Sequence, residues 1–499
     1  MELKFQKSDM HYLDTILHEV QNQEQTQEVK LSDGMPDIGR VIAAWGMPII
    51  RGKEWHSNRI AASGGVMVWV LYAPEDGTDA RCVETWMPFQ MEWDIPGSER
   101  DGTIRVQPLL RFVDARSISA RKLMIRTGVA VLAEALVPGS AQVAMPEARE
   151  ENVELLINTY PVRLLQYAGE KSFLLDEELT LPASCPLPEK LICYTAQPEI
   201  TERSISANRV VFKGNANLHI LYRSDDGQLH TWDFALPFSQ LGEWDRGDDA
   251  DAQADVILCT TSLEVNMDEQ GHLRVKCGLL GQFSVDQRMP IAVTEDAYGI
   301  HREVTPQMEM LELPVILEGR QENIYGEQTI PQDGNILVDV QFLPDFPRTR
   351  RMGDGMELEI PGQIQVLYYG EDGLLQSSTA RWEAGSHLSA DENTIIHSRV
   401  LPAGKPNAMF SGGQIHVKAN AMLETESTAQ QRIPMVAGLE VGQPQKPETS
   451  RPSLILRRAG EEGLWQLAKA AGSTVTSIRQ ANGLEAEPVL GQMLLIPVS

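Results

Sequence analysis

The chain has 499 residues, a length that indicates about three or four domains. Its 70 acidic and 43 basic residues give a formal net charge of −27. Proteins that bind nucleic acids or anionic membranes need clustered positive charge, so this composition argues against both classes. No apolar run approaches the roughly 20 residues of a membrane-spanning helix, and we therefore expect a globular protein that does not span a membrane.

The first ten residues contain no basic segment followed by an apolar one, so we expect no secretion signal. The five cysteines are odd in number, sparse, and form no Cys-x-x-Cys pair. This pattern is typical of reduced, mostly buried thiols in a cytosolic compartment.

A strand-turn pattern recurs about every 150 residues, at 68–77, 218–227 and 364–373. Each copy alternates apolar residues, reaches a Leu-Tyr pair, and then carries an Asp-Gly pair at the same distance. Alternation predicts a strand with one buried face. Asp-Gly favours a tight hairpin, because glycine tolerates positive φ. Each copy is therefore predicted to be a β-hairpin.

The predicted return strands carry aromatic residues at Trp86, Trp232 and Trp382. Two copies continue with Pro88-Phe89 and Pro237-Phe238, whereas the third has Glu383-Ala384 after its tryptophan. Two further landmarks keep the same order and nearly the same period, one at 28–31, 178–181 and 327–330, the other at 123–126, 273–276 and 415–418.

These landmarks predict three tandem, mainly β repeats, each a β-sandwich or barrel-like domain. We place them at residues 1–150, 151–303 and 304–437. The one helical pattern in this part is a short stretch around Tyr12–Val20. Residues 438–452 have no apolar periodicity and read as an extended linker.

Residues 453–499 form a different module, whose four basic and four acidic residues balance. Apolar spacing predicts a strand at 454–456, a helix through Leu464 to Ala471, a second helix from Val475, and a closing strand before Val498. Gly472 and Asn482-Gly483 would end the helices, and Ser473 or Thr474 would cap the second one. Trp465 and Ile496 are predicted core positions.

This β-α-α-β tail resembles a LysM domain. The similarity rests on the turn at 460–465, the helix end at 467–472, the turn at 482–484 and the closing segment Gly491 to Pro497. The resemblance implies a binding groove for a partner or glycan at Gly460, Glu461, Glu462, Gly463, Leu464, Asn482, Gly483 and Leu484. Glu461-Glu462-Gly463 departs from the family's usual Asp-Thr turn, which argues against sugar binding.

Three β repeats followed by a LysM module resemble the SipL-type spore morphogenesis proteins, whose repeats are SPOCS domains. The resemblance implies a cytoplasmic protein of the mother cell that works at the surface of the forespore and in spore coat assembly. Its expected partners are the coat morphogenetic ATPase, contacted through the LysM domain, and other coat proteins. It implies no enzymatic activity and no cofactor.

The sequence shows no pattern of a catalytic or metal site. No His-Glu-x-x-His, Gly-x-Ser-x-Gly or phosphate-binding glycine motif occurs. Acidic clusters at Glu147–Glu154, Glu243–Asp251 and Glu322–Glu327 fit solvated loops better than acid–base catalysis. Two alternatives stay open: a glycan-binding protein for peptidoglycan or chitin polymers, with an acidic β stalk, and a hydrolase with a LysM targeting tail.

Overall fold

A computed structural model describes residues 2–95, 102–148, 150–244, 251–268, 270–353, 355–445 and 452–498. The chain is mainly β, as predicted, and the two helices of the described ranges both lie near the C-terminus. Residues 446–451 of the predicted linker and most of the acidic cluster Glu243–Asp251 lie outside these ranges.

Residues 5–146 form two three-stranded antiparallel sheets, in the orders β2-β7-β6 and β3-β4-β5. The second region repeats this arrangement as β8-β13-β12 and β11-β10-β9. The strands of these two copies are β2 (Phe5–Lys30), β3 (Ile38–His56), β4 (Arg59–Pro74), β5 (Arg81–Asp94), β6 (Thr103–Ser119), β7 (Lys122–Pro146), β8 (Val153–Thr180), β9 (Pro188–Ser206), β10 (Arg209–Ser224), β11 (Leu229–Glu243), β12 (Ala252–Met267) and β13 (His272–Gly299).

The third copy keeps this plan but splits two of its strands. In its sheets, β14 and β19 flank β21, and β15 and β18 flank β17, while β20 and β16 pair with the same central strands. The bounds are β14 (Val304–Ile330), β15 (Ile336–Pro344), β16 (Arg348–Met352), β17 (Gly355–Tyr369), β18 (Leu375–Ser389), β19 (Ile395–Pro402), β20 (Asn407–Ser411) and β21 (Gln414–Val441). The repeat boundaries predicted from the sequence fall between β7 and β8 and between β13 and β14, and they remain a prediction.

The hairpin landmarks occupy equivalent places in the three copies. Tyr72, Tyr222 and Tyr368 lie on β4, β10 and β17 and are all buried. The glycines of the following turns adopt positive φ, as the Asp-Gly pairs predicted: Gly77, Gly227 and Gly373. In each copy the two sheets pack face to face and bury their alternating apolar residues between them, which makes each copy a β-sandwich.

In the Pro-Phe landmark, a large phenylalanine ring on one strand lies opposite a glycine on the neighbouring strand. Phe89 pairs with Gly64, and Phe238 pairs with Gly214. A Cβ on Gly214 would lie 2.7 Å from the Phe238 ring, so the large ring and the missing side chain depend on each other. At the equivalent place of the third copy Ala384 pairs with Ile360, which explains why that copy lacks the Phe.

The three tryptophans of the return strands do not occupy equivalent places. Trp382 lies two residues before Ala384 and is fully buried, so its counterparts are Met87 and Leu236 rather than Trp86 and Trp232. Trp86 and Trp232 are half-buried. A shared residue type therefore does not mark equivalent positions on these strands, because the strand register decides which side chain enters the core.

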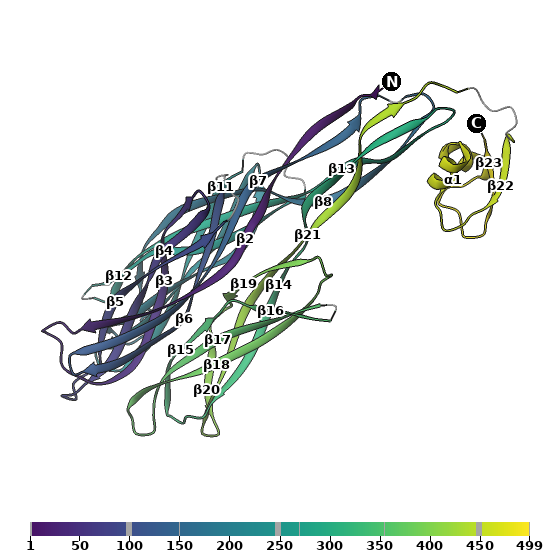
Figure 1. The fold of residues 1–499 in the computed structure, drawn as a ribbon. Helices are drawn as coiled ribbons and strands as arrows, with labels where there is room; N and C mark the ends of the chain where they lie inside the picture. Colours follow the sequence, from purple (N-terminus) through teal and green to yellow (C-terminus); the bar gives the residue numbers. More distant parts are fainter. Residues whose placement is uncertain are drawn as a thin grey trace.

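The longest strands continue beyond the sandwiches as three antiparallel ribbons, which together we call the stalk. It comprises residues 5–15 with 136–146, 153–165 with 286–299, and 304–316 with 428–441. A pairing irregularity marks its base in each ribbon, at Ile16, Gln166 and Leu317. At about 3.3 Å per residue, the 13 residues of β8 in the stalk extend roughly 40 Å. Figure 1 shows the stalk extending from the three sandwiches. We call the three sandwiches together the head.

The ribbons of the stalk pack on one another through apolar residues from all three copies, among them Val143, Leu164, Val293, Leu313 and Ile433. The helix expected around Tyr12–Val20 is wrong: this stretch belongs to β2 and pairs with β7. The cause is tertiary, because β7 provides hydrogen-bonding partners along the whole length of β2 and overrides the local helical pattern.

The linker predicted from Gly438 begins later than expected. β21 continues to Val441, where Leu439 and Val441 are buried and the short strand β1 (Glu2–Leu3) pairs alongside. The C-terminal module then shows the predicted order of elements: β22 (Leu454–Arg458), α1 (Leu464–Ala471), α2 (Val475–Asn482) and β23 (Met493–Pro497). Gly472 and Gly483 end the helices with positive φ, and Thr474 caps α2 by accepting a hydrogen bond from Ser477 N–H.

All five cysteines are free thiols, as their number and spacing predicted. Cys193, Cys259 and Cys277 are buried and the other two half-buried. Within the described ranges, neither helix has the length and apolarity needed to cross a membrane.

Candidate functional site

The eight predicted groove residues of the C-terminal module differ in exposure. Glu461, Gly463 and Gly483 are exposed, whereas Leu464 is buried in the core of the module and Leu484 packs partly against it. The Glu462 carboxylate accepts a hydrogen bond from Arg457 at 2.8 Å. The exposed part of the predicted groove is therefore smaller than the sequence pattern implies.

Asn482 holds the module together rather than offering a free amide. Its Nδ2 donates to the Ile478 and Leu495 carbonyls, at 2.8 and 2.6 Å, and its Oδ1 accepts from the Leu495 N–H at 2.7 Å. These bonds tie the end of α2 to β23. A substitution at Asn482 would therefore destabilise the module, and its effect on binding would follow from that loss of folding.

Glu487 connects the two segments of the predicted groove, the turn before α1 and the end of α2. The sequence did not indicate this residue. Its carboxylate accepts from the Leu464 N–H at 2.9 Å and lies 3.5 Å from the Arg479 guanidinium. A carboxylate at the N-terminus of α1 satisfies a free N–H and complements the helix dipole. No local capping pattern reveals this residue, because it comes from the loop after α2, 23 positions from Leu464.

The module lies beside the tip of the stalk (Figure 1) and contacts it through side chains. Asp296 of β13 accepts hydrogen bonds from Trp465 Nε1 at 2.8 Å and from Lys469 Nζ at 2.7 Å. Tyr298 donates to the Ser473 carbonyl at 2.8 Å, and its ring packs edge-on against Trp465 with centroids 4.8 Å apart. Burial would raise the pKa of Asp296, but Lys469 and Trp465 lower it below its ordinary value.

Trp465 was predicted to be a core residue of the module. Its indole instead bridges the module and the stalk, through Asp296 and Tyr298. Ile496 is buried in the core as expected. The face of α1 that carries Trp465 and Lys469 faces β13, while Glu461 and Gly483 of the predicted groove stay exposed.

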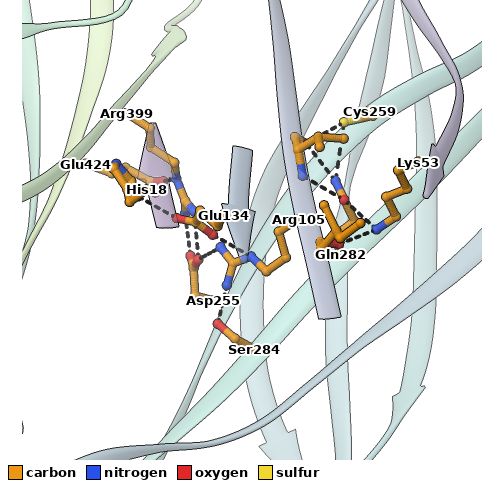
Figure 2. Close-up of polar contacts among 12 residues, drawn as sticks. His18, Lys53, Arg105, Glu134, Asp255, Cys259, Gln282, Ser284, Arg399 and Glu424 are labelled. Carbon is orange, nitrogen blue, oxygen red and sulfur yellow. Dashed lines mark hydrogen bonds and ion pairs between the residues drawn. The ribbon is translucent and has the colours of Figure 1, made fainter. Parts of the chain in front are cut away.

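A second polar site lies where the three copies meet in the head. Arg105 on β6, Asp255 on β12 and Arg399 on β19 occupy equivalent places, because each pairs with the corresponding residue of its neighbouring strand: Glu134, Ser284 and Glu424. We call these six residues the central junction; Figure 2 shows their side chains converging from the three copies.

Asp255 is the hub of the central junction. It accepts from Arg105 at 2.6 Å, from Arg399 at 2.7 Å and from Arg203 at 2.9 Å. Arg105 also contacts Glu134 at 3.0 Å and donates to Ser284, while Arg399 pairs with Glu424. The Arg105 side chain is only 5% exposed, so its charge depends on these partners.

Burial and charge oppose each other at the junction. Burial would raise the pKa of Asp255, but Arg399 and Arg105 hold it well below its ordinary range. Burial also opposes the charge of Glu134, but the Arg105 guanidinium and the hydrogen bond with His18 outweigh it and lower the pKa of Glu134 to about 2. Glu426 behaves differently: burial and the nearby carboxylates of Asp255 and Glu134 raise its pKa to about 7.

A glutamine side chain connects two of the copies beside the junction. Gln282 of β13 pairs with the backbone of Val106 on β6, accepting from its N–H at 2.9 Å and donating to its carbonyl at 2.8 Å. Its Oε1 also accepts from Lys53 at 2.8 Å. β6 is an edge strand of its sheet, and these bonds satisfy backbone groups that an edge strand otherwise exposes.

The central junction binds the copies together and leaves few groups for chemistry. Its carboxylates are engaged by arginines, so the arrangement stabilises the head rather than supplying a free acid and base. The described residues contain no group of three or more His, Cys, Asp or Glu placed to hold a metal ion. Residue type gave no sign of the junction, since its three equivalent positions carry Arg, Asp and Arg. The 150-residue spacing of Arg105 and Asp255 was the one signal present.

The comparisons with known proteins agree with the repeat pattern in one segment. Residues 188–266, which run from β9 through β12, match the family model described as SipL, SPOCS domain. This segment contains Arg203 and Asp255 of the junction region. The match indicates a sporulation-related role. No curated protein and no solved structure matches the chain.

Proposed function

We propose that the chain is a non-enzymatic assembly protein of the spore coat, in which a head of three SPOCS-type sandwiches carries a LysM-type module on a stalk. The module docks onto the coat morphogenetic ATPase at the forespore surface, and the head contacts other coat proteins. The similarity of residues 188–266 to a SPOCS domain supports the sporulation setting.

The observation that carries this proposal is the placement of the module at the stalk tip with part of its predicted groove exposed. Asp296 and Tyr298 contact α1 and the turn after it, and these contacts leave Glu461 and Gly483 exposed. A module held at the end of a stalk roughly 40 Å long places this surface at a distance from the head. Two separate contact surfaces on one chain raise the effective concentration of each at a shared target.

The test is binding of the purified full-length chain to the purified ATPase, measured by biolayer interferometry. We expect Glu461→Lys to weaken binding at least tenfold, because it reverses a charge in the exposed groove. Gln480→Lys, which adds a positive charge on the exposed face of α2, is the matched control and should bind like the unmodified chain. Equal binding by both variants would remove the groove from the proposal.

A spore-forming cell provides the second arm. A fluorescent fusion of the full chain should collect around the forespore, and a fusion lacking residues 453–499 should stay dispersed in the mother cell. If the shortened fusion still collects around the forespore, the head rather than the module is the docking element.

A further inference from the structure

The sheet of the C-terminal module carries apolar side chains on its solvent face. β22 and β23 pair with Leu456 opposite Leu495, and the two-residue period of a strand places Leu454 and Met493 on the same face. These four side chains are exposed by 63%, 38%, 51% and 47% in that order. We call them the outer face. Contiguous exposed apolar side chains of this kind mark interaction surfaces.

The opposite face of the same sheet forms the core of the module. Leu494 and Ile496 are 0% and 1% exposed and pack with the residues of the two helices. An antiparallel sheet with one face in water normally alternates apolar and polar residues, but this sheet is mainly apolar on both faces. The turn before β23 adds the exposed side chains of Val489 and Leu490. The sequence of β22 and β23 is therefore that of a sheet covered on both sides.

The stalk does not cover the outer face. The module contacts the stalk through α1, whose Trp465 and Lys469 donate to Asp296. Figure 1 shows β22 and β23 on the side of the module away from β13. The exposed groove residues Glu461 and Gly483 lie outside both strands. A second molecule can therefore reach the outer face while the stalk contact stays in place.

The distribution of charge favours a second copy of the chain as that molecule. The net charge is −27, and residues 453–499 balance, so all of the net negative charge belongs to residues 1–452. Two heads or two stalks brought together would repel each other. Two modules carry no net charge, and stalks roughly 40 Å long hold the heads beyond the Debye length of about 8 Å.

We propose that the outer face packs against the same face of a second copy, which joins two chains through their C-terminal modules. An uncharged apolar face is complementary to itself, as a twofold contact requires. Each five-residue strand spans only about 17 Å, so the contact is smaller than a standard interface and the dimer is weak. The inference goes beyond the docking role proposed above, because Glu461 and Gly483 are not part of the contact.

The first test is the mass of the purified full-length chain in sedimentation equilibrium. We expect the average mass to rise from that of one chain toward that of two as the concentration increases to about 100 μM. The dimer should have a larger maximum dimension in X-ray scattering than the monomer, because the two heads lie apart. A monomer throughout this range, or a compact dimer with its heads in contact, would overturn the proposal.

Two variants locate the contact. Leu456→Glu places an unpaired charge in the apolar interface and should raise the dissociation constant of the dimer at least about tenfold. Leu174→Glu makes the same change at a leucine of β8 in the head that is 58% exposed, and it should leave the dimer unchanged. Equal effects of the two variants would refute the assignment.

Binding to the ATPase separates this proposal from the docking role. If the unmodified chain stays a monomer and Leu456→Glu weakens binding to the ATPase, the outer face belongs to that partner and the proposed dimer is wrong. A dimer that forms while Glu461→Lys leaves ATPase binding unchanged would remove the groove but keep the dimer. If Leu456→Glu does not fold, the mass of the unmodified chain still decides.

Discussion

Arg105 of β6 and Asp255 of β12 stand at equivalent places of two copies, 150 residues apart, and their side chains form an ion pair of 2.6 Å. Three identical copies would bring three like charges together at this point, which a buried site does not tolerate. The third copy supplies Arg399, so the two arginines share the one carboxylate. Divergence of the copies thus allows their strands to meet closely.

Asp255→Asn should strongly destabilise the head, because Arg105 and Arg399 would lose the carboxylate that compensates their buried charges. Breaking a buried pair in this way costs about 3–5 kcal/mol. The measurement is urea denaturation followed by circular dichroism. Glu327→Gln, which removes an exposed partner of Lys418, should leave the midpoint almost unchanged. A similar small change for Asp255→Asn would show that the junction does not hold the copies together.

Glu426→Gln should stabilise the protein, increasingly so as the pH rises. The folded pKa of about 7 lies above the ordinary value of 4.5, so between about pH 4.5 and pH 7 the unfolded chain loses the Glu426 proton that the folded chain retains, and stability falls. The variant should match the unmodified chain at pH 4.5 and exceed it by roughly 2–3 kcal/mol at pH 8. Denaturation at both pH values measures this difference.

Glu424→Gln is the control on the same strand. Glu424 pairs with Arg399, so its loss should destabilise the protein at both pH values instead. An identical response of the two variants would mean that Glu426 is not kept neutral by its surroundings.

Asp296→Ala combined with Tyr298→Ala should release the C-terminal module from the stalk. The double variant removes the acceptor for Trp465 and Lys469 and the ring that packs on Trp465. Hydrogen exchange in α1 should become faster, and the radius of gyration from X-ray scattering should increase, while the melting of the head stays the same. Glu309→Ala, an exposed change on the stalk strand β14, should alter neither. An unchanged exchange rate in the double variant would contradict the docked arrangement.

Gly214→Ala should disturb the second sandwich, because its Cβ would lie 1.9 Å from the Glu199 carbonyl oxygen as well as against the Phe238 ring. We expect a loss of about 1–3 kcal/mol or more in the free energy of unfolding. Gly319→Ala is the matched control on β14, where an added Cβ meets no atom within 4 Å. If both substitutions have the same small effect, the exchange of Gly and Phe between strands is not a packing requirement.

The sequence by itself determined the local structure. Alternating residues such as Val68, Val70 and Tyr72 predicted the strands, and Gly77 predicted the turn, because these signals depend only on neighbours along the chain. The order of elements in the C-terminal module followed for the same reason, as did a cap on its second helix at Ser473 or Thr474; the structure places the cap at Thr474. The similarity of residues 188–266 to a SPOCS domain agrees with the repeat landmarks of that segment.

The tertiary structure alone decided what lies between the copies and between the stalk and the module. Tyr12–Val20 became strand because β7 lies beside it. Trp465 found its partner at Asp296, 169 residues earlier, and Arg399 found Asp255 at a distance of 144. Such contacts leave no periodic pattern in the sequence. The free energy of burying these charged and aromatic groups depends on strands that are far apart along the chain and meet only in the folded protein.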